Sequence, residues 1–187
     1  MPYQRSSKRL TADRSAVLVI DLQEKLVPAI PSAEDVVHFT DALLRVAERL
    51  QVPSAATVQY PKGLGGLVSP LDDWFDEPEE KLDFSAAVCR RELDQWISDG
   101  RDQILICGVE THICVLQTVL DLQQEGLTPV VISEAVAARG GWEHETAIEQ
   151  LRDLGVSITT LESVIYQWLE TADHPEFKAI SRIVKSL

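Results

Sequence analysis

A carboxylate, an amine and a thiol each stand beside an apolar run of the sequence. Asp21 follows the run Ala16 to Ile20, Lys81 opens the stretch "KLDF", and Cys114 comes six residues after "ILICG". A thiolate can attack a carbonyl carbon, and a carboxylate can take the thiol proton and return it to a leaving amine. An ammonium and a helix N-terminus both favour the thiolate, and N–H groups at the turn can hold an oxyanion. These residue types are typical of a nucleophilic hydrolase for an amide or ester.

Each of the three residues also has an ordinary structural interpretation. An aspartate usually caps or pairs at the surface, and Lys81 lies in the charge-rich stretch "EPEEKLD". A free cysteine is commonly a small buried hydrophobe. The residue types alone therefore leave chemistry and packing open.

The elements that must position these residues alternate along the chain. Apolar β-branched runs predict buried parallel strands, and apolar residues at helical spacing predict helices. The strands are expected near 16–20, 54–58, 81–84, 102–108, 128–135 and 155–162, and the helices near 32–50, 92–100, 111–126, 143–154, 162–170 and 175–185. This order predicts one α/β domain over 1–187, a parallel sheet in a three-layer α/β/α fold. Such sheets bind ligands beyond the carboxyl ends of their strands.

The composition narrows the choice of partners. The net charge of the 187 residues is -13, which disfavours nucleic acid and anionic membranes and leaves a small-molecule substrate. The three cysteines form no C-x-x-C pair, so a disulfide framework is not expected and a cytoplasmic location is. The first residues do not resemble a signal peptide, and no apolar run has the length of a membrane helix.

Three stretches resemble the signature regions of the isochorismatase-like cysteine hydrolases: "VLVIDLQ", "KLDFSA" and "GVETHICVLQT". The resemblance covers nearly the whole chain and is strongest for the isochorismatase domain-containing proteins of unassigned substrate. It implies a six-stranded parallel sheet of order 3-2-1-4-5-6 and a catalytic triad of Asp21, Lys81 and Cys114. It also implies a cis peptide before Glu110 and an oxyanion hole made by the backbone N–H groups of Glu110 and Cys114.

Departures from two relatives of that superfamily narrow the chemistry. Nicotinamidases carry an aspartate and paired histidines as metal ligands after the second strand, whereas residues 59–70, "QYPKGLGGLVSP", hold neither type. Neither a catalytic metal nor another cofactor is therefore expected, and nicotinamide is disfavoured as the substrate. True isochorismatases act on a vinyl ether and lack the nucleophilic cysteine, so Cys114 disfavours that reaction.

Several residues near the expected site are candidates for substrate contact. Gln23 lies two residues past Asp21, where it would either face the pocket or make a local hydrogen bond. His112 diverges from Cys114 by about 200° on a helix and is not expected to pair with it. His144 is expected to face solvent. The candidates for substrate binding are Gln23, Tyr60, Lys62, Leu64, Arg139 and Trp142.

The leading hypothesis is a metal-independent cysteine hydrolase that cleaves a C–N bond of a small amide or ureido compound through a thioester. Asp21 would act as base and then as acid, and Lys81 would lower the pKa of the thiol and orient Asp21. Two alternatives stay open: a non-catalytic binding or scaffold module, and an isochorismatase-type ether hydrolase. The apolar run "VIYQWL" (164–169) and the habit of the family predict a homo-oligomer.

Overall fold

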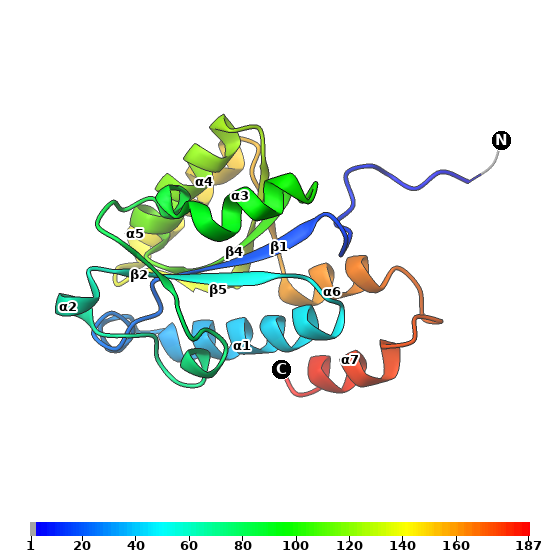
Figure 1. Ribbon diagram of the computed structural model, residues 1–187, viewed down its shortest axis with the longest axis horizontal. Coiled ribbons are helices and arrows are strands. Elements are labelled where there is room, and N and C mark those ends of the chain that lie inside the picture. The colour runs from blue at the N-terminus through cyan, green and yellow to red at the C-terminus, as the bar shows by residue number, and fades with distance from the viewer. Residues whose placement is uncertain (1–2) are drawn as a thin grey trace.

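The computed structural model describes residues 3–187, and they form one parallel sheet with helices on both faces (Figure 1). The strand order is β3-β2-β1-β4-β5-β6, and each neighbouring pair runs parallel. This confirms the predicted fold class and strand order. The strands are β1 Ser15–Ile20, β2 Ser54–Gln59, β3 Glu79–Lys81, β4 Gln103–Val109, β5 Thr128–Ala137 and β6 Ser157–Thr159.

The helices divide into two layers. In Figure 1, α1, α6 and α7 lie on one side of the sheet, and α3, α4 and α5 lie on the other. The helices are α1 Ala33–Arg49, α2 Pro61–Leu64, α3 Arg90–Ser98, α4 Leu116–Gln124, α5 Gly141–Asp153, α6 Leu161–Leu169 and α7 Phe177–Val184. Shorter helical turns are η1 Val27–Ala29, η2 Leu71–Asp73, η3 Ala86–Val88 and η4 Thr111–Val115.

The central strand β1 supplies both halves of the core. Val17 and Val19 belong to the cluster under α1, α6 and α7, whereas Leu18 and Ile20 belong to the cluster under α3, α4 and α5. Successive side chains of a strand point to opposite faces, so a strand covered on both sides must be apolar at every position. Among residues 3–187, no helix is long and apolar enough to cross a membrane.

Three expectations from the sequence need correction. The third strand lies at Glu79–Lys81 rather than over 81–84, so Lys81, expected at its start or its end, stands at its end. The helix expected from residue 111 begins as a five-residue π-helical turn, η4, before α4 continues it. The apolar run at 164–169 packs mostly into the core, where Val164 and Trp168 are 0% and 3% exposed, and Tyr166, at 41%, is its exposed large apolar side chain.

Gly108 pairs with Ile20 at the ends of β4 and β1, where the backbone leaves no room for a side chain. Its φ is +122°, a value that side chains rarely adopt, and an added Cβ would collide with the carbonyl oxygen of Ile20. Glycine is therefore required at this point of β4. The close approach places Asp21, the residue after β1, beside the turn that follows β4.

Candidate active site

Asp21 and Lys81 form a buried ion pair at the carboxyl edge of the sheet. Lys81 Nζ lies 2.6 Å from Asp21 Oδ2, and both side chains have no solvent exposure. The other carboxylate oxygen, Oδ1, accepts a hydrogen bond of 2.9 Å from the hydroxyl of Thr57 on β2. A buried charge is tolerated only when it is paired and hydrogen-bonded, and both conditions hold for Asp21.

Lys81 makes its remaining contacts within the chain. Nζ donates to Gln59 Oε1 at 2.7 Å and to the carbonyl oxygens of Phe84 and Asp83 at 3.1 and 3.3 Å. An ammonium has three protons to donate, and four protein acceptors surround this one. Lys81 is therefore placed to hold the Asp21 carboxylate rather than to reach for a substrate.

The backbone turns sharply where β1 and β2 end. Asp21 has a φ of +54° and Tyr60 a φ of +39°, both in the left-handed region that residues other than glycine rarely occupy. Such conformations cost of order 1–3 kcal/mol each and cluster at functional sites, where the surrounding structure holds them. At Asp21 the backbone makes this turn while the carboxylate points toward Thr57 and Lys81 and bonds to both.

Cys114 lies on η4 beside this ion pair. It is 7% exposed, and the charges of both Asp21 and Lys81 act on the pKa of its thiol. The structure therefore brings together the three residues that the sequence proposed as a triad. It leaves their catalytic roles as a proposal.

The electrostatics of Cys114 do not favour the expected thiolate. The pKa of Cys114 is raised to about 12, first by burial and then by the negative charge of Asp21, while Lys81 acts in the expected direction and lowers it. The sequence-based expectation of a depressed pKa is wrong because burial and Asp21 together outweigh Lys81. At neutral pH the resting arrangement is a protonated thiol beside a carboxylate.

The pKa alone does not single out Cys114. Burial also raises the pKa of Cys89 to about 11 and that of Cys107 to about 12. Cys107 is fully buried in β4, and Cys89 begins α3. Asp21 and Lys81 also act on the pKa of Cys89, but only for Cys114 are they the largest influences after burial, and they do not affect Cys107.

The turn between β4 and Cys114 has an unusual backbone. The peptide bond from Val109 to Glu110 is cis. The N–H groups of Ile113 and Val115 both donate to the carbonyl oxygen of Glu110, at 3.0 and 3.3 Å. The Glu110 carboxylate is buried and accepts hydrogen bonds from Arg139, one from the backbone N–H at 2.9 Å and others from Nε at 3.1 Å.

His144 does not face solvent as the sequence predicted. Its ring is partly buried, and Nδ1 shares a hydrogen bond of 2.9 Å with the hydroxyl of Thr111, the residue after Glu110. Burial lowers the pKa of His144, which favours the neutral ring. His112, by contrast, is partly buried with no hydrogen-bond partner for Nδ1 among the described residues.

Gln23 takes the local alternative that the sequence left open. The side chain is fully buried, and its Nε2 donates to the carbonyl oxygens of Gln59 and Gly65 at 3.0 and 2.7 Å. Its Oε1 accepts from the backbone N–H of Gln59 at 2.8 Å. Gln23 thus ties the end of β1 to the end of β2 and to the loop at Gly65.

The other candidates for substrate contact lie on different cavities. Tyr60 and Lys62 line a cavity of about 330 Å³ that reaches Lys81, while Leu64 lies outside its lining. Trp142 is 83% exposed and lines a separate cavity of about 360 Å³ with His112. Tyr60 and Lys62 therefore lie on a cavity that borders Lys81, although the Lys81 side chain itself has no solvent exposure.

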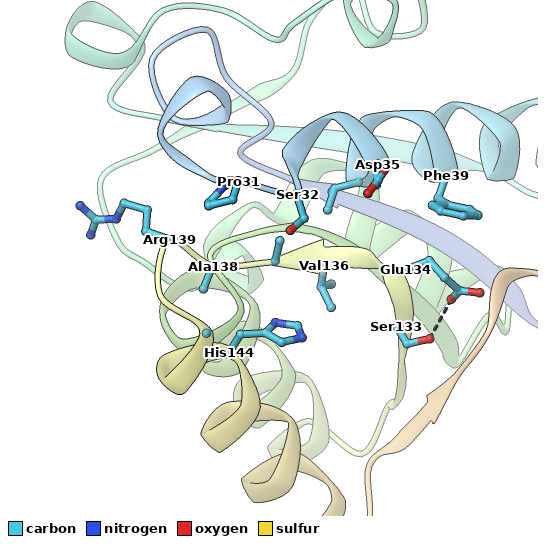
Figure 2. A pocket seen from close by; sticks show the side chains of 13 residues that line it. Pro31, Ser32, Asp35, Phe39, Ser133, Glu134, Val136, Ala138, Arg139 and His144 are labelled. Atoms are coloured by element: carbon cyan, nitrogen blue, oxygen red, sulfur yellow. Dashed lines mark hydrogen bonds between the residues drawn. The ribbon is translucent and has the colours of Figure 1, made fainter.

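Arg139 lies on two further cavities. One, of about 320 Å³, it shares with Glu110 and His112. The other, of about 450 Å³, lies between the start of α1 and the end of β5 (Figure 2). In Figure 2, His144 extends into this space, whereas Arg139 sits at its edge and extends away from it. The lining includes Pro31, Ser32, Asp35, Phe39, Glu134, Val136 and Ala138. Among residues 3–187, no cluster of three or more His, Cys, Asp or Glu side chains is arranged to hold a metal.

Two residues of the site were missed from the sequence. Thr57 and Gln59 contact Asp21 and Lys81 from β2, two positions apart and hence on the same side of the strand. The signal for them is a polar residue at each of two alternate positions near the carboxyl end of a strand. Their partners depend on the register, which pairs Gln59 with Lys81.

Comparison with known proteins gives a consistent set of matches. The model of the isochorismatase domain family matches residues 15–163. The secreted isochorismatase effector Isc1 of Phytophthora sojae is 36% identical over 185 residues, which span 95% of this chain and 87% of that protein. Isochorismatase domain-containing protein 2A of Mus musculus is 37% identical over 181 residues, with 95% and 85% covered.

Solved structures share the fold as well. The MAR1 ribonuclease of Caenorhabditis elegans superposes with a TM-score of 0.88 at 32% identity, covering 95% of this chain and 92% of that one. The YcaC gene product of Escherichia coli, described as an octameric hydrolase of unknown specificity, superposes with a TM-score of 0.79 at 20% identity, covering 98% and 99%. The second match establishes the shared fold alone.

Proposed function

The chain belongs to the isochorismatase family, whose members are generally cysteine hydrolases, and we propose that it hydrolyses a C–N bond of a small amide or ureido compound. The reaction passes through a thioester on Cys114 and uses no metal. The observation that carries the proposal is the buried 2.6 Å Asp21–Lys81 pair at the carboxyl edge of the sheet, whose two charges both act on the thiol of Cys114.

The first half of the reaction forms the thioester. The sulfur of Cys114 bonds to the carbonyl carbon while its proton passes to the Asp21 carboxylate, because the raised thiol pKa leaves the proton on sulfur at rest. The backbone N–H groups of Glu110 and Cys114 hold the oxyanion. The C–N bond then breaks, and Asp21 returns the proton to the leaving nitrogen.

The second half releases the acid. Water attacks the thioester carbon while Asp21 takes one of its protons, the C–S bond breaks, and the proton returns to sulfur. Lys81 remains charged throughout and holds the carboxylate within reach of both nucleophiles. This assignment agrees with the four acceptors around Nζ, which leave it no role in contacting the substrate.

The size of the adjacent cavity favours a small substrate. The space lined by Tyr60, Lys62 and Lys81 measures about 330 Å³, near the lower end of the roughly 300–1,000 Å³ usual for small-molecule sites. We assign substrate contact to Tyr60 and Lys62, with Lys62 favouring a substrate that carries a negative or carbonyl oxygen. Trp142 and Leu64 gain no support from this cavity.

A screen of small amides and ureas for ammonia or amine release tests the proposal. The wild-type protein should release product from at least one compound, and Cys114→Ala should release none. Cys89→Ala removes another buried thiol outside the site and serves as the matched control, which should keep its activity. Product release by Cys114→Ala would contradict the proposal.

The alternatives predict different results in the same screen. A vinyl ether hydrolase would act on isochorismate and keep that activity in Cys114→Ala, and a binding module would release no product from any compound. The C. elegans relative is named a ribonuclease. We do not propose that activity for this chain, because its net charge of -13 repels nucleic acid.

We also propose that the chain forms a homo-oligomer. The support is the octameric description of the E. coli relative and the exposure of Trp142, at 83%, since aromatic residues are enriched at protein interfaces. Light scattering in solution should give a multiple of the 20.8 kDa chain mass. A mass of one chain at micromolar concentration would overturn this part.

A further inference from the structure

The two residues that follow the cis peptide are both held from the segment that begins α5. Glu110 is 7% exposed and its carboxylate is held by Arg139, while Thr111 is fully buried and its hydroxyl is bonded to His144. Glu110 supplies one of the proposed oxyanion donors. The segment 139–144 therefore contacts the oxyanion turn without contributing a member of the triad.

Arg139 holds the Glu110 carboxylate with both its backbone and its side chain. The backbone N–H of Arg139 donates to Oε2 at 2.9 Å, and Nε lies 3.1 Å from each carboxylate oxygen. On the other side of the same residue, the N–H groups of Ile113 and Val115 fix the Glu110 carbonyl. Glu110 is therefore held through its side chain and through the carbonyl of the peptide that follows it, which restrains the residue whose N–H is proposed to bind the oxyanion.

Arg139 also balances the negative charge of the Glu110 carboxylate. A buried carboxylate on the residue that donates to an oxyanion would oppose the second negative charge that forms there, unless a cation neutralises it. Arg139 supplies that cation from a side chain that is 63% exposed, through an ion pair with the nearly buried Glu110. The guanidinium therefore affects the oxyanion turn without entering the site.

We propose that Arg139 is a positioning residue that fixes and neutralises Glu110 so that its backbone N–H can hold the oxyanion, and that it is not a substrate contact. This inference rests on the proposed function. Arg139 extends away from the 450 Å³ cavity in Figure 2, and the 320 Å³ cavity that it shares with Glu110 is lined by no member of the triad.

Two reactions of the Cys114 thiol distinguish a positioning role of Arg139 at the oxyanion donor from a general effect of Arg139 on the fold. Acylation of Cys114 by p-nitrophenyl acetate passes through a tetrahedral oxyanion: the C–S bond forms, p-nitrophenolate leaves, and Asp21 takes the thiol proton. Alkylation by iodoacetamide forms the C–S bond as iodide leaves and has no oxyanion. Peptide mass spectrometry assigns both products to Cys114, with Cys114→Ala as the blank.

The expected result is selective. Losing one oxyanion donor costs about 10²–10³-fold, so a misplaced donor in Arg139→Ala should slow acylation by at least about tenfold. Alkylation should stay within about twofold of wild type. Arg139→Lys, which keeps the charge and the backbone donor but loses Nε, should recover part of the acylation rate. Arg152→Ala, an exposed arginine at the far end of α5, should change neither rate.

A double variant tests the charge. When Glu110→Gln removes the carboxylate charge, Arg139→Ala should slow acylation less than it does alone, a coupling that two independent effects would not give. Equal slowing of both reactions by Arg139→Ala, or slowing of neither, would overturn the inference while leaving the proposed function intact. If wild-type Cys114 reacts with neither reagent, the proposed function fails and the inference with it. If Arg139→Ala loses its thermal transition, the comparison of Arg139→Lys with wild type carries the same test.

Discussion

Lys81 Nζ lies 2.6 Å from Asp21 Oδ2, and neither side chain is exposed to solvent. Two charges removed from water in this way stabilise the fold only as a pair, and either one left alone is costly. The pair also adjoins the thiol, so the same contact links the stability of the sheet edge to the reactivity of Cys114.

Breaking this pair should destabilise the protein strongly. Lys81→Met leaves the Asp21 carboxylate buried and uncompensated, so the free energy of unfolding should fall by about 3–5 kcal/mol in urea denaturation. Arg49→Ala removes a partly exposed partner of Glu176 and should cost less than about 1 kcal/mol. Similar losses for the two variants would show that the buried pair is not held as described.

The two charges should move the thiol pKa in opposite directions. Asp21 raises it and Lys81 lowers it, so Asp21→Asn should bring the pKa of Cys114 below about 12 and Lys81→Met should raise it. Because iodoacetamide reacts with the thiolate, the wild-type alkylation rate should rise about tenfold per pH unit through the neutral range without a plateau.

At a fixed neutral pH, Asp21→Asn should therefore alkylate faster than wild type and yet hydrolyse no substrate, since nothing then carries the proton to the leaving amine. The measurement is the pH dependence of labelling at Cys114 in a Cys89→Ala background. Slower labelling of Asp21→Asn would contradict the assigned electrostatics.

Thr57 should matter more than its neutral side chain suggests. Thr57→Val keeps the shape but removes the donor that lies 2.9 Å from Asp21 Oδ1, which leaves a buried carboxylate oxygen short of one hydrogen bond. We expect a loss of about 1–3 kcal/mol in unfolding free energy and a fall in kcat, both measured beside Thr57→Ser. Thr57→Ser should retain most of the unfolding free energy and most of kcat. A Thr57→Val variant as active as wild type would show that Thr57 has no role in the reaction.

Gly108 should be far less replaceable than another glycine with positive φ. Gly108→Ala must overcome both its φ of +122° and a collision with the Ile20 carbonyl, whereas Gly100→Ala at φ +79° meets open space. The Gly100 variant should lose about 1 kcal/mol and the Gly108 variant about 2–4 kcal/mol, together with most activity. Equal melting temperatures would show that β1 and β4 do not approach so closely.

The fold and the three central residues could be predicted from the sequence because each depends on local information. The apolar runs mark the strands, and Asp21, Lys81 and Cys114 lie where strands or their following turns end. The specific Gly-Val-x-Thr-x-x-Cys pattern added the family. The sequence shows which residues follow a strand. In a parallel sheet, residues that follow strands meet at the same edge, so this information is enough to bring their side chains together.

The rest depends on quantities that no local pattern carries. The pKa of Cys114 is the balance of burial, Asp21 and Lys81, and a sequence does not show which of them is largest. Gln59 depends on strand register, and His144 on how α5 packs against the oxyanion turn. The ion pair of Arg139 with Glu110 joins residues 29 positions apart, and no local pattern shows it.

The most direct measurement is the mass of the peptide that contains Cys114, taken from a reaction quenched in acid while an amide is being hydrolysed. The account predicts an added acyl group on Cys114 and none on Cys89 or Cys107. Continued hydrolysis with no acyl group on any of the three cysteines would contradict it.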